Sequence, residues 1–402
     1  MGMPAKGIGQ NENALSEHLG GVKIAASETG VLAVDLDALR RNYRTLAAKA
    51  AKAECAAVVK GNGYGLGSLE VAEALIAEEC RTFFVATLGE AEKLALSGTL
   101  PDSVIYVLDG LPPGSAVDYA ARGVRPVLGD LGEIEEWASL CQARDEPLAA
   151  ALHVDSGMNR LGLKAADQKM LIDKPELLDG VPVSLIMSHL ACADVPDHPK
   201  NAGQRDRFTQ FAAAMPAAPL SLANSAGVFL GPDYHFDVVR PGIALYGGNP
   251  YASLANPMEP VVRLYGRILQ VGDAAAGETV GYGAMRTLTR PSRYATVAVG
   301  YADGYFRALG SSDAAPGAIA SLDGQPLPIL GRVSMDLIVF DVTDLPHERA
   351  RRGGFVELIG PNFTVDEMGS LAGSFSYEML TSLGPRYARI YLDASEGEQG
   401  HG

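Results

Sequence analysis

The sequence lacks the features that mark several large classes of protein. No apolar stretch in its 402 residues reaches the roughly 20 residues that a membrane-spanning helix needs, so we expect no membrane segment. Only four cysteines are present, far apart in the chain, which argues against a zinc site or a disulfide framework and favours a reducing cytoplasm. The first thirty residues contain no apolar signal segment, so we expect no export.

Basic charge is also scarce. The chain has 33 Lys and Arg against 48 Asp and Glu, a formal net charge of −15, which argues against nucleic acid or an anionic membrane as a partner. Any anion that this protein binds must therefore be held by a local site. Hydrophobic residues make up 47% of the chain and charged residues 20%, as expected for a globular protein with a large core. The length suits one large domain and one smaller domain.

Strand and helix patterns alternate through the first part of the chain. A short strand at 31–35 precedes a helical pattern that begins at Leu36. Eight candidate strands follow, at residues 55–60, 82–88, 104–109, 124–128, 149–154, 183–188, 219–224 and 236–240. Helical patterns of suitable length for right-handed crossovers separate these strands. Eight such units predict an α/β fold, a closed (β/α)8 or TIM barrel.

Near Tyr246 the pattern changes. Helical periodicity disappears, and short β-rich segments are separated by Gly, Pro and Asp, which predicts a C-terminal all-β domain. The predicted limits are a disordered tail over 1–30, a strand over 31–36 that pairs with the β-domain, the barrel over 37–250, the β-domain over 251–393, and a tail over 394–402.

The stretch from Cys55 to Gly67 is the most informative part of the sequence. An apolar run ends at Lys60, and the alternating glycines of Gly61-Asn-Gly-Tyr64-Gly follow. The end of a parallel strand lies at the rim where such folds bind ligands, and apolar neighbours make a lysine amine a usable nucleophile. The glycines allow backbone N–H groups to approach an anion, although neither a Walker loop nor a dinucleotide fingerprint is complete. Taken alone, Lys60 is explained equally well by a surface ion pair.

Four further polar residues fall at, or one residue past, the carboxyl ends of other candidate strands: His153, His189, Ser225 and Arg240. A single histidine at a strand end is more often structural. A closed barrel brings all five polar ends to one rim, however, and this convergence predicts a binding site there.

Several stretches spread along the chain match one family pattern. They are Val-Val-Lys60-Gly-Asn-Gly-Tyr64-Gly, His-Val-Asp155-Ser-Gly-Met-Asn-Arg160-Leu-Gly, Met-Ser-His189-Leu-Ala-Cys-Ala-Asp, Leu-Ala-Asn224-Ser225-Ala-Gly, Val-Arg240-Pro-Gly242-Ile243-Ala-Leu-Tyr246-Gly, Val-Gly-Tyr282-Gly-Ala, Val-Gly-Tyr301-Ala-Asp-Gly-Tyr305, Gly-Arg-Val-Ser334-Met335-Asp336 and Ser-Tyr377-Glu. These stretches occur in the family's order between residues 33 and 391. The chain therefore resembles the alanine racemase family of fold type III pyridoxal-phosphate enzymes, which combine a barrel with a β-domain.

The resemblance implies an isomerase that interconverts L- and D-alanine with pyridoxal 5'-phosphate. Lys60 matches the family's Schiff-base lysine, which is also one acid/base group, and Tyr282 matches the second base, on the opposite face of the substrate. Because a phenol with a pKa near 10 is a poor base at neutral pH, His189 and Arg240 are its implied helpers.

The resemblance also assigns the binding residues. The implied cofactor-binding residues are Lys60, Tyr64, His189, Asn224, Ser225, Arg240, Gly242, Ile243 and Tyr377. The implied substrate-binding residues are Arg160, Met335 and Tyr301. Arg240 matches the arginine at the pyridine nitrogen, and the neighbouring subunit contributes the equivalents of Met335 and Tyr301. The implied partners are therefore a small amino acid and a second copy of the chain in a homodimer with shared sites.

Departures from the family pattern concern three places. Ser334 stands where many members carry Cys, which puts no catalytic role at risk. Gly61 and Gly63 stand where alanine is common, so the lysine loop gains freedom. His153 stands where many members carry a carbamylated lysine, an anion that holds the equivalent of Arg160. Since imidazole cannot supply that charge, we expect a bound anion or another acidic group to support Arg160.

The resemblance leaves alternatives open. A broad-specificity racemase of serine, lysine or arginine has the same fold and is the runner-up. A noncatalytic pyridoxal-phosphate carrier needs Lys60 but not Tyr282, and a decarboxylase normally has a carboxylate where Arg240 stands. The leading expectation is a cytoplasmic enzyme that supplies D-alanine for peptidoglycan.

Overall fold

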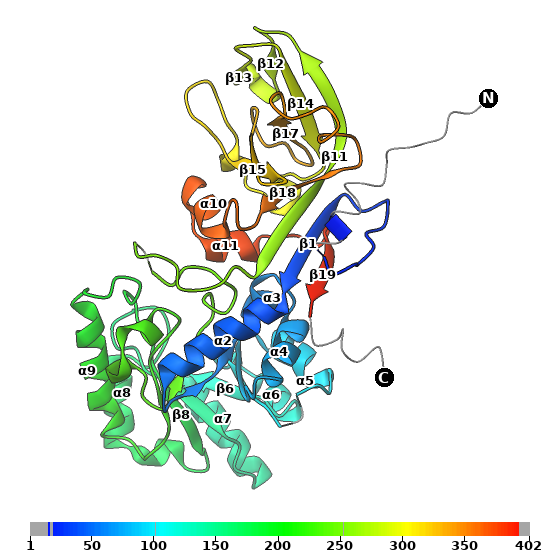
Figure 1. The fold of residues 1–402 in the computed structure, drawn as a ribbon. Helices are drawn as coiled ribbons and strands as arrows, with labels where there is room; N and C mark the ends of the chain where they lie inside the picture. The colour runs from blue at the N-terminus through cyan, green and yellow to red at the C-terminus, as the bar shows by residue number, and fades with distance from the viewer. Residues whose placement is uncertain (1–14, 17–18, 101, 252, 394–402) are drawn as a thin grey trace. The chain divides into compact units, whose positions relative to one another are not determined.

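The computed structural model describes residues 15–16, 19–100, 102–251 and 253–393. They divide into two units (Figure 1). The barrel unit is Leu39–Glu259, and the β-unit combines the described residues up to Ala38 with those from Pro260 onward.

The barrel unit is built on short parallel strands that follow one another in chain order. They are β2 (Glu54–Cys55), β3 (Ala57–Val58), β4 (Thr82–Val85), β5 (Val104–Val107), β6 (Arg125–Leu128), β7 (Ala150–His153), β8 (Val183–Met187), β9 (Leu220–Ser221) and β10 (Val238–Val239). Strands β3 to β9 form one seven-stranded sheet. A bridge between Asn224 and Arg240 joins the end of β9 to β10, which pairs with β2. Because only Ala56 separates β2 from β3, the sheet closes, and the predicted (β/α)8 barrel is confirmed.

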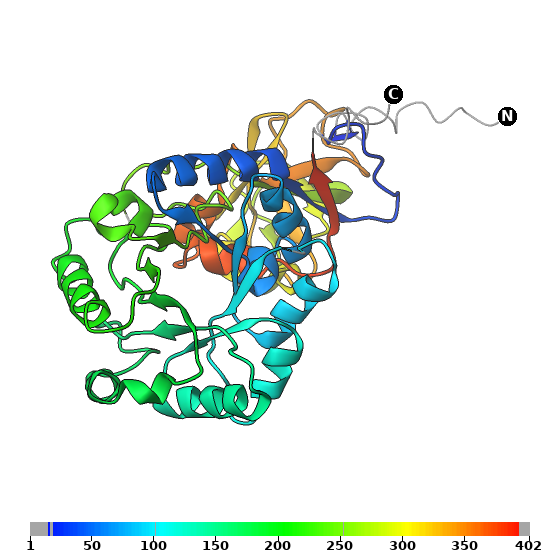
Figure 2. The same ribbon diagram turned by 90° about the horizontal axis from the view of Figure 1, so that it is seen from below.

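Helices surround the strands of this unit (Figure 2). They are α2 (Leu36–Ala50), α4 (Ser68–Ile76), α5 (Leu88–Leu96), α6 (Ala116–Ala121), α7 (Leu131–Arg144), α8 (Ala165–Asp173) and α9 (Lys200–Ala212). Apolar residues at helical spacing explain their packing, as in α7, which buries Ile134, Trp137 and Cys141. The last connection differs from the regular pattern, because short 3-10 turns, η2 (Gly227–Leu230) and η3 (Pro232–Tyr234), follow β9 in place of an α-helix.

The β-unit contains an eight-stranded sheet. Its strands are β1 (Gly30–Asp35), β11 (Val262–Ala274), β14 (Ser292–Val297), β15 (Ile319–Leu322), β16 (Gln325–Pro328), β17 (Ile338–Asp341), β18 (Phe355–Ile359) and β19 (Ala388–Leu392). The long strand β11 is central and pairs with β1, β14 and β18. Strand β1 also pairs in parallel with β19, so the N-terminal strand is part of this sheet. The predicted C-terminal β-domain is confirmed.

Two helices in the β-unit were not indicated by the sequence pattern. These are α10 (Val365–Leu371) and α11 (Ser376–Thr381). Both are too short to show a clear apolar period. A capping box marks the start of α10, where Thr364 and Glu367 exchange hydrogen bonds. The expectation that helices disappear after Tyr246 is therefore wrong for this segment.

The N-terminal stretch also differs from the predicted tail over 1–30. Residues 1–14 and 17–18 lie outside the described residues, as does the predicted tail over 394–402. Leu15 and Leu19 are buried in a cluster with Val31 and Tyr265, and Ile24 packs against it. This part of the chain therefore contributes to the core of the β-unit. Its few apolar residues are too widely spaced to predict that packing.

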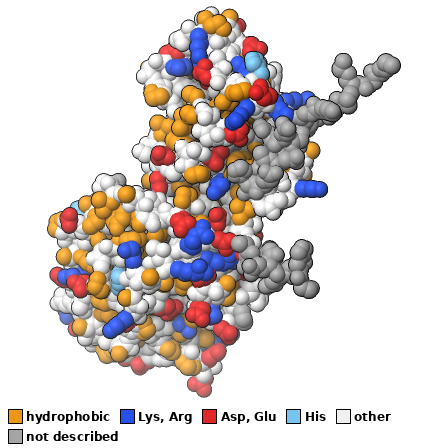
Figure 3. All heavy atoms as spheres, in the orientation of Figure 1, with side chains coloured by type: hydrophobic (Ala, Val, Ile, Leu, Met, Phe, Trp, Pro, Cys, Tyr) orange, Lys and Arg blue, Asp and Glu red, His pale blue; other side chains and the backbone are white. Residues whose placement is uncertain are grey.

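On the face drawn in Figure 3, Lys and Arg side chains are interspersed with Asp and Glu. Among the described residues, charged side chains also form ion pairs, such as that of Arg44 with Glu78, at 2.5 Å. Within the described ranges, no helix combines the length and apolar character that crossing a membrane requires.

Candidate active site

Lys60 lies two residues after strand β3 and opens a short element, α3 (Lys60–Tyr64). The next four residues all have positive φ: 64° at Gly61, 55° at Asn62, 62° at Gly63 and 53° at Tyr64. They therefore form a left-handed turn. Because glycine adopts positive φ without a steric penalty, the alternating glycines explain how the chain turns directly after Lys60.

Neighbouring helices anchor this turn. The Glu90 carboxylate on α5 accepts hydrogen bonds from the N–H groups of Gly61, at 2.7 Å, and Ala86, at 2.8 Å. The Asn62 side-chain oxygen accepts from the N–H of Ser68, at 3.3 Å, where α4 begins. The backbone next to Lys60 is thus held from two sides.

Two groups at this rim have lowered pKa values. Burial lowers the pKa of Lys60, and the charge of Arg160 lowers it further. A larger fraction of the Lys60 amine is then neutral, as a nucleophile or base requires. Burial, followed by the charge of Arg240, keeps the pKa of His189 well below its ordinary value. His189 is therefore a neutral imidazole at neutral pH.

Arg240 is a buried cation, only 3% exposed, directly after β10. Its guanidinium donates to the carbonyl of Ser188, at 2.6 Å, and to the hydroxyl of Ser221. Burial lowers the pKa of Arg240 to about 9, so it remains protonated at neutral pH. Asn224 lies beside it through the backbone bridge, and its side-chain oxygen accepts an N–H of the following turn, at 2.9 Å.

Ser225, Gly242, Ile243 and Tyr64 form a cradle of hydrogen-bonding groups. The Ser225 hydroxyl accepts the N–H of Gly242, at 2.8 Å. A Cβ on Gly242 would lie only 2.2 Å from the Tyr64 hydroxyl, so only glycine fits there. Ile243 is fully buried, and its N–H has no acceptor within the described part of the chain. A buried N–H without an acceptor beside two hydroxyls suits an anion such as a phosphate.

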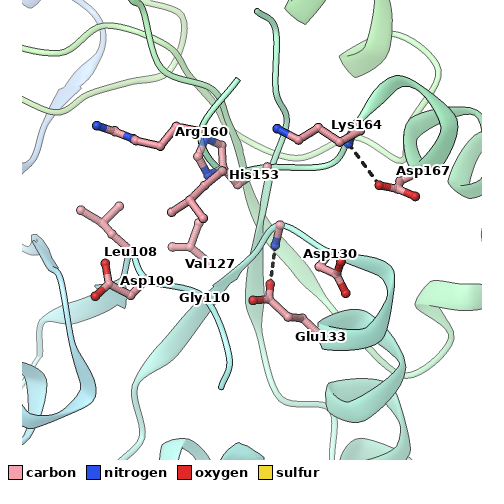
Figure 4. A pocket seen from close by; sticks show the side chains of 13 residues that line it. Leu108, Asp109, Gly110, Val127, Asp130, Glu133, His153, Arg160, Lys164 and Asp167 are labelled. Carbon is pink, nitrogen blue, oxygen red and sulfur yellow. Dashed lines mark hydrogen bonds between the residues drawn. The ribbon is translucent and has the colours of Figure 1, made fainter. Parts of the chain in front are cut away.

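Arg160 and His153 line a pocket of about 220 Å³ on the barrel unit (Figure 4). Burial, followed by the charge of Arg240, lowers the pKa of His153 to about 4, so its imidazole is neutral and supplies no negative charge. Among the described residues Arg160 has no hydrogen-bond or ion-pair partner. The Asp109 carboxylate lines the same pocket. That an anion or acidic group supports Arg160 therefore stays a prediction, for which Asp109, two residues after β5, is one acidic candidate.

Asp155 holds the loop that carries Arg160. Its carboxylate pairs with Lys164, at 2.5 Å, and accepts the N–H groups of Gly157 and Asn159, at 2.9 and 3.1 Å. The Asp155 side chain is therefore structural here, and it fixes the backbone immediately before Arg160.

The remaining predicted site residues belong to the β-unit. Tyr282 lies in the turn between the short strands β12 (Thr279–Val280) and β13 (Arg286–Thr287), and it is 73% exposed. Tyr301 and Met335 are 43% and 54% exposed. They lie on adjacent loops, because the N–H of Tyr301 donates to the carbonyl of Ser334, at 3.0 Å. Tyr377 lies in α11, where its ring packs against Phe375 with centroids 5.4 Å apart.

The structure thus brings the predicted residues together in two groups. The rim of the barrel unit holds Lys60, Tyr64, Arg160, His189, Asn224, Ser225, Arg240, Gly242 and Ile243. The β-unit holds Tyr282, Tyr301, Met335 and Tyr377. No cluster of His, Cys, Asp or Glu that could bind a metal ion occurs in the described ranges.

Some contributors to the site were missed from the sequence. Tyr246 stacks on Tyr64 with ring centroids 4.6 Å apart, and Ser221 accepts from Arg240. Glu90 anchors the lysine turn from a helix 29 positions further along the chain. A Thr87-x-x-Glu90 pattern was available as a signal, but it predicts only a local helix cap.

A closed barrel with a lysine of lowered pKa and a cradle of hydrogen-bonding groups at its rim, joined to a β-unit, defines the class of fold type III pyridoxal-phosphate enzymes. Comparison with known proteins agrees. The family model "Alanine racemase, N-terminal domain" matches residues 34–250, and "Alanine racemase, C-terminal domain" matches residues 261–391.

Individual relatives cover nearly the whole chain. An alanine racemase of Methylobacterium nodulans is 52% identical over 90% of this chain and 96% of its own. A crystal structure of alanine racemase from Bartonella henselae with covalently bound pyridoxal phosphate is 40% identical, covers 90% of this chain and 99% of its own, and has a TM-score of 0.84. Biosynthetic alanine racemase from Pseudomonas aeruginosa is 36% identical with a TM-score of 0.81, covering 90% and 99%. This chain belongs to the alanine racemase family of isomerases, and its cofactor is pyridoxal 5'-phosphate.

Proposed function

We propose that this protein interconverts L-alanine and D-alanine with Lys60 and Tyr282 as its two acid/base groups. The observation that carries the proposal is the position of Lys60, whose amine has a lowered pKa and lies at the same barrel rim as the cradle of hydrogen-bonding groups. The family membership of the whole chain supports the same reaction.

The described residues fit the cofactor. Lys60 would hold it through its amine, and Arg240 would face its ring nitrogen. Its phosphate would be held by the hydroxyls of Tyr64, Ser225 and Tyr377 and the N–H groups of Gly242 and Ile243. His189 and Asn224 would line the ring. When bound, pyridoxal phosphate supplies an electron sink for the negative charge left by removing the substrate's α-proton.

Two bases are needed because racemisation removes the α-proton from one face of the carbon and returns it on the other. The Lys60 amine serves one face, and the Tyr282 phenol serves the other. We assign His189 and Arg240 to stabilising the phenolate, and the free guanidinium of Arg160 to binding the substrate carboxylate. Because Arg240 stays protonated, it does not deliver a proton to the ring nitrogen, which limits side reactions such as transamination.

The site is proposed to be shared between two copies of the chain in a homodimer. Tyr282, Tyr301 and Met335 are large side chains that the β-unit leaves 43% to 73% exposed. Large apolar or aromatic side chains that stay exposed mark places where another surface packs. In the proposed dimer, they complete the barrel site of the partner copy.

We also place the enzyme in the cytoplasm, where it supplies D-alanine for peptidoglycan. The names of relatives include both a catabolic and a biosynthetic role. A catabolic alanine racemase from Agrobacterium fabrum is 45% identical, and a biosynthetic one from the same species is 44% identical. A deletion strain that grows only with added D-alanine would support the biosynthetic role. Growth without D-alanine, but failure on L-alanine as a carbon source, would contradict it.

The activity is tested by incubating the purified protein with L- and D-amino acids in D₂O and following deuterium entry at the α-carbon. Alanine is expected to exchange and racemise faster than serine, lysine or arginine. Lys60→Ala should lose the visible absorbance of covalently held cofactor. Tyr282→Phe should keep that absorbance and lose racemisation by about 10²-fold or more. Normal racemisation by Tyr282→Phe would show that the second base is another residue.

A further inference from the structure

Two loops of the β-unit carry Tyr301 and Met335, and the backbone joins them closely. The N–H groups of Tyr301 and Ala302 donate to the carbonyls of Ser334 and Met335, both at 3.0 Å. A Cβ on Gly300 would lie 2.3 Å from the Met335 carbonyl oxygen, so the loops touch at this point. The two predicted substrate-binding side chains therefore depend on one shared loop contact.

A single arginine spans both loops. The Nε of Arg386 donates to Asp303 at 2.6 Å, and its Nη1 donates to Asp336 at 2.8 Å. Asp303 ends the turn that begins at Tyr301, and Asp336 directly follows Met335. The second oxygen of Asp303 accepts the N–H of Gly300, at 2.8 Å, which fixes the start of the same turn.

The exposure of these groups differs between the two loops. The Asp303 side chain is 8% exposed, whereas those of Arg386 and Asp336 are 49% and 55% exposed. Exposed ion pairs contribute little to the free energy of unfolding, typically about 0–1 kcal/mol. The contact with Asp336 is thus better suited to fixing a loop than to stabilising the fold.

We propose that Arg386 is a positioning residue, which through Asp303 and Asp336 fixes the loops that present Tyr301 and Met335 to the substrate. This inference rests on the proposed function. A planar guanidinium reaches two carboxylates in fixed directions with separate N–H groups. A lysine ammonium is a single point charge on a flexible stem, so it cannot reproduce both contacts. The role is one of geometry, and Arg386 itself performs no proton transfer.

The β-unit offers a matched control. Arg290 is also 49% exposed, and its guanidinium makes two hydrogen bonds to Asp344, at 2.8 and 2.5 Å. None of the predicted site residues lies in that contact. Arg290→Lys and Asp344→Asn therefore reproduce the chemical change of Arg386→Lys and Asp336→Asn away from the two loops.

The experiment combines amide hydrogen exchange with steady-state kinetics on the cofactor-loaded protein. In Arg386→Lys, segments 299–305 and 333–338 should exchange about tenfold faster than in the wild type. KM for both alanine enantiomers should rise about fivefold, while kcat stays within about twofold, because Lys60 and Tyr282 are unchanged. Asp336→Asn should produce a smaller change of the same kind. The two control variants should change neither quantity.

The proposal is overturned if amide exchange in segments 299–305 and 333–338 is no faster in Arg386→Lys than in Arg290→Lys. It is also overturned if exchange in Arg386→Lys is faster but KM is unchanged. A fall in melting temperature well beyond that of the control would make Arg386 a stability residue and would also count against it. If the wild-type protein does not racemise alanine, the proposed function fails, while the exchange data still decide whether Arg386 holds the two loops together.

Discussion

Lys60 is presented by a left-handed turn, and the cost of that turn depends on which residues form it. An L-residue in a left-handed conformation costs roughly 1–2 kcal/mol, whereas glycine adopts it freely. Glycine occupies two of the four positions, at 61 and 63, and asparagine, which tolerates this region well, occupies position 62. The strain is therefore concentrated at Tyr64, whose ring is held by stacking on Tyr246.

Gly63→Ala tests this account of the turn. Its φ is 62°, and a Cβ there would lie 3.1 Å from the backbone nitrogen of Ser68. We expect the free energy of unfolding to fall by about 1–2 kcal/mol, measured by urea denaturation. Gly98→Ala is the control. Gly98 also has a positive φ, 72°, but a Cβ there would have no other atom within 4 Å. If Gly63→Ala lowers the free energy of unfolding more than Gly98→Ala does, the difference measures the contact with Ser68. Equal decreases would mean that only the backbone conformation matters.

Asp155 gives a prediction that depends on pH. Burial raises the pKa of its carboxyl, but hydrogen bonds from Lys164 and from backbone N–H groups outweigh burial and lower it to about 2. A depressed carboxyl pKa adds stability that is fully present above the unfolded value of 3.8 and is lost as the pH falls toward 2. Asp155→Asn should therefore lower the free energy of unfolding by about 2 kcal/mol near neutral pH.

The cost of Asp155→Asn should shrink when urea unfolding is repeated at pH values between about 4 and 2. Asp173→Asn is a matched control, because Asp173 pairs with Lys169 at the same 2.5 Å but is 54% exposed. It should cost less than about 1 kcal/mol at any pH. A pH-independent loss in Asp155→Asn would show that the ionised carboxylate is not what stabilises the loop.

The sequence predicted some residues of the site and not others, for a physical reason. The position of Lys60 followed from an apolar run that ends in glycines, which is a local pattern. The partners of Arg240 could not be predicted, because Ser188 directly follows β8, Ser221 lies in β9, and ordinary serines carry no local signal. The assigned roles of the site residues stay predictions until the variants are measured.

At the scale of elements, the barrel strands were predictable because strands buried on both faces read as continuous apolar runs. Two parts of the fold could not be predicted from the sequence. The connection after β9 has only 3-10 turns, since residues 225–235 contain Gly231 and Pro232, which interrupt an α-helix. The N-terminal strand was predicted to pair with the β-domain, but its parallel partner β19 was not predicted, because no local pattern indicates a pairing between opposite ends of the sequence.

At the scale of the whole molecule, the proposed sharing of sites between two copies makes a prediction that no single variant can test. Lys60→Ala and Tyr282→Phe homodimers should each be inactive. When the two are mixed and allowed to exchange subunits, each heterodimer has one site with both defects and one site with neither. Half of the dimers in an equal mixture are heterodimers, so about a quarter of the wild-type activity should return.

The reverse mixture distinguishes shared sites from sites built within one chain. A chain that carries both Lys60→Ala and Tyr282→Phe is mixed with an equal amount of wild-type chain. If the sites are shared, each site of a heterodimer has one defect, and only the wild-type homodimers, about a quarter of the dimers, remain active. If each chain builds its own site, every wild-type chain keeps its activity and about half remains. Native mass spectrometry on differently tagged chains confirms the exchange, and half-activity with heterodimers present would disprove the shared site.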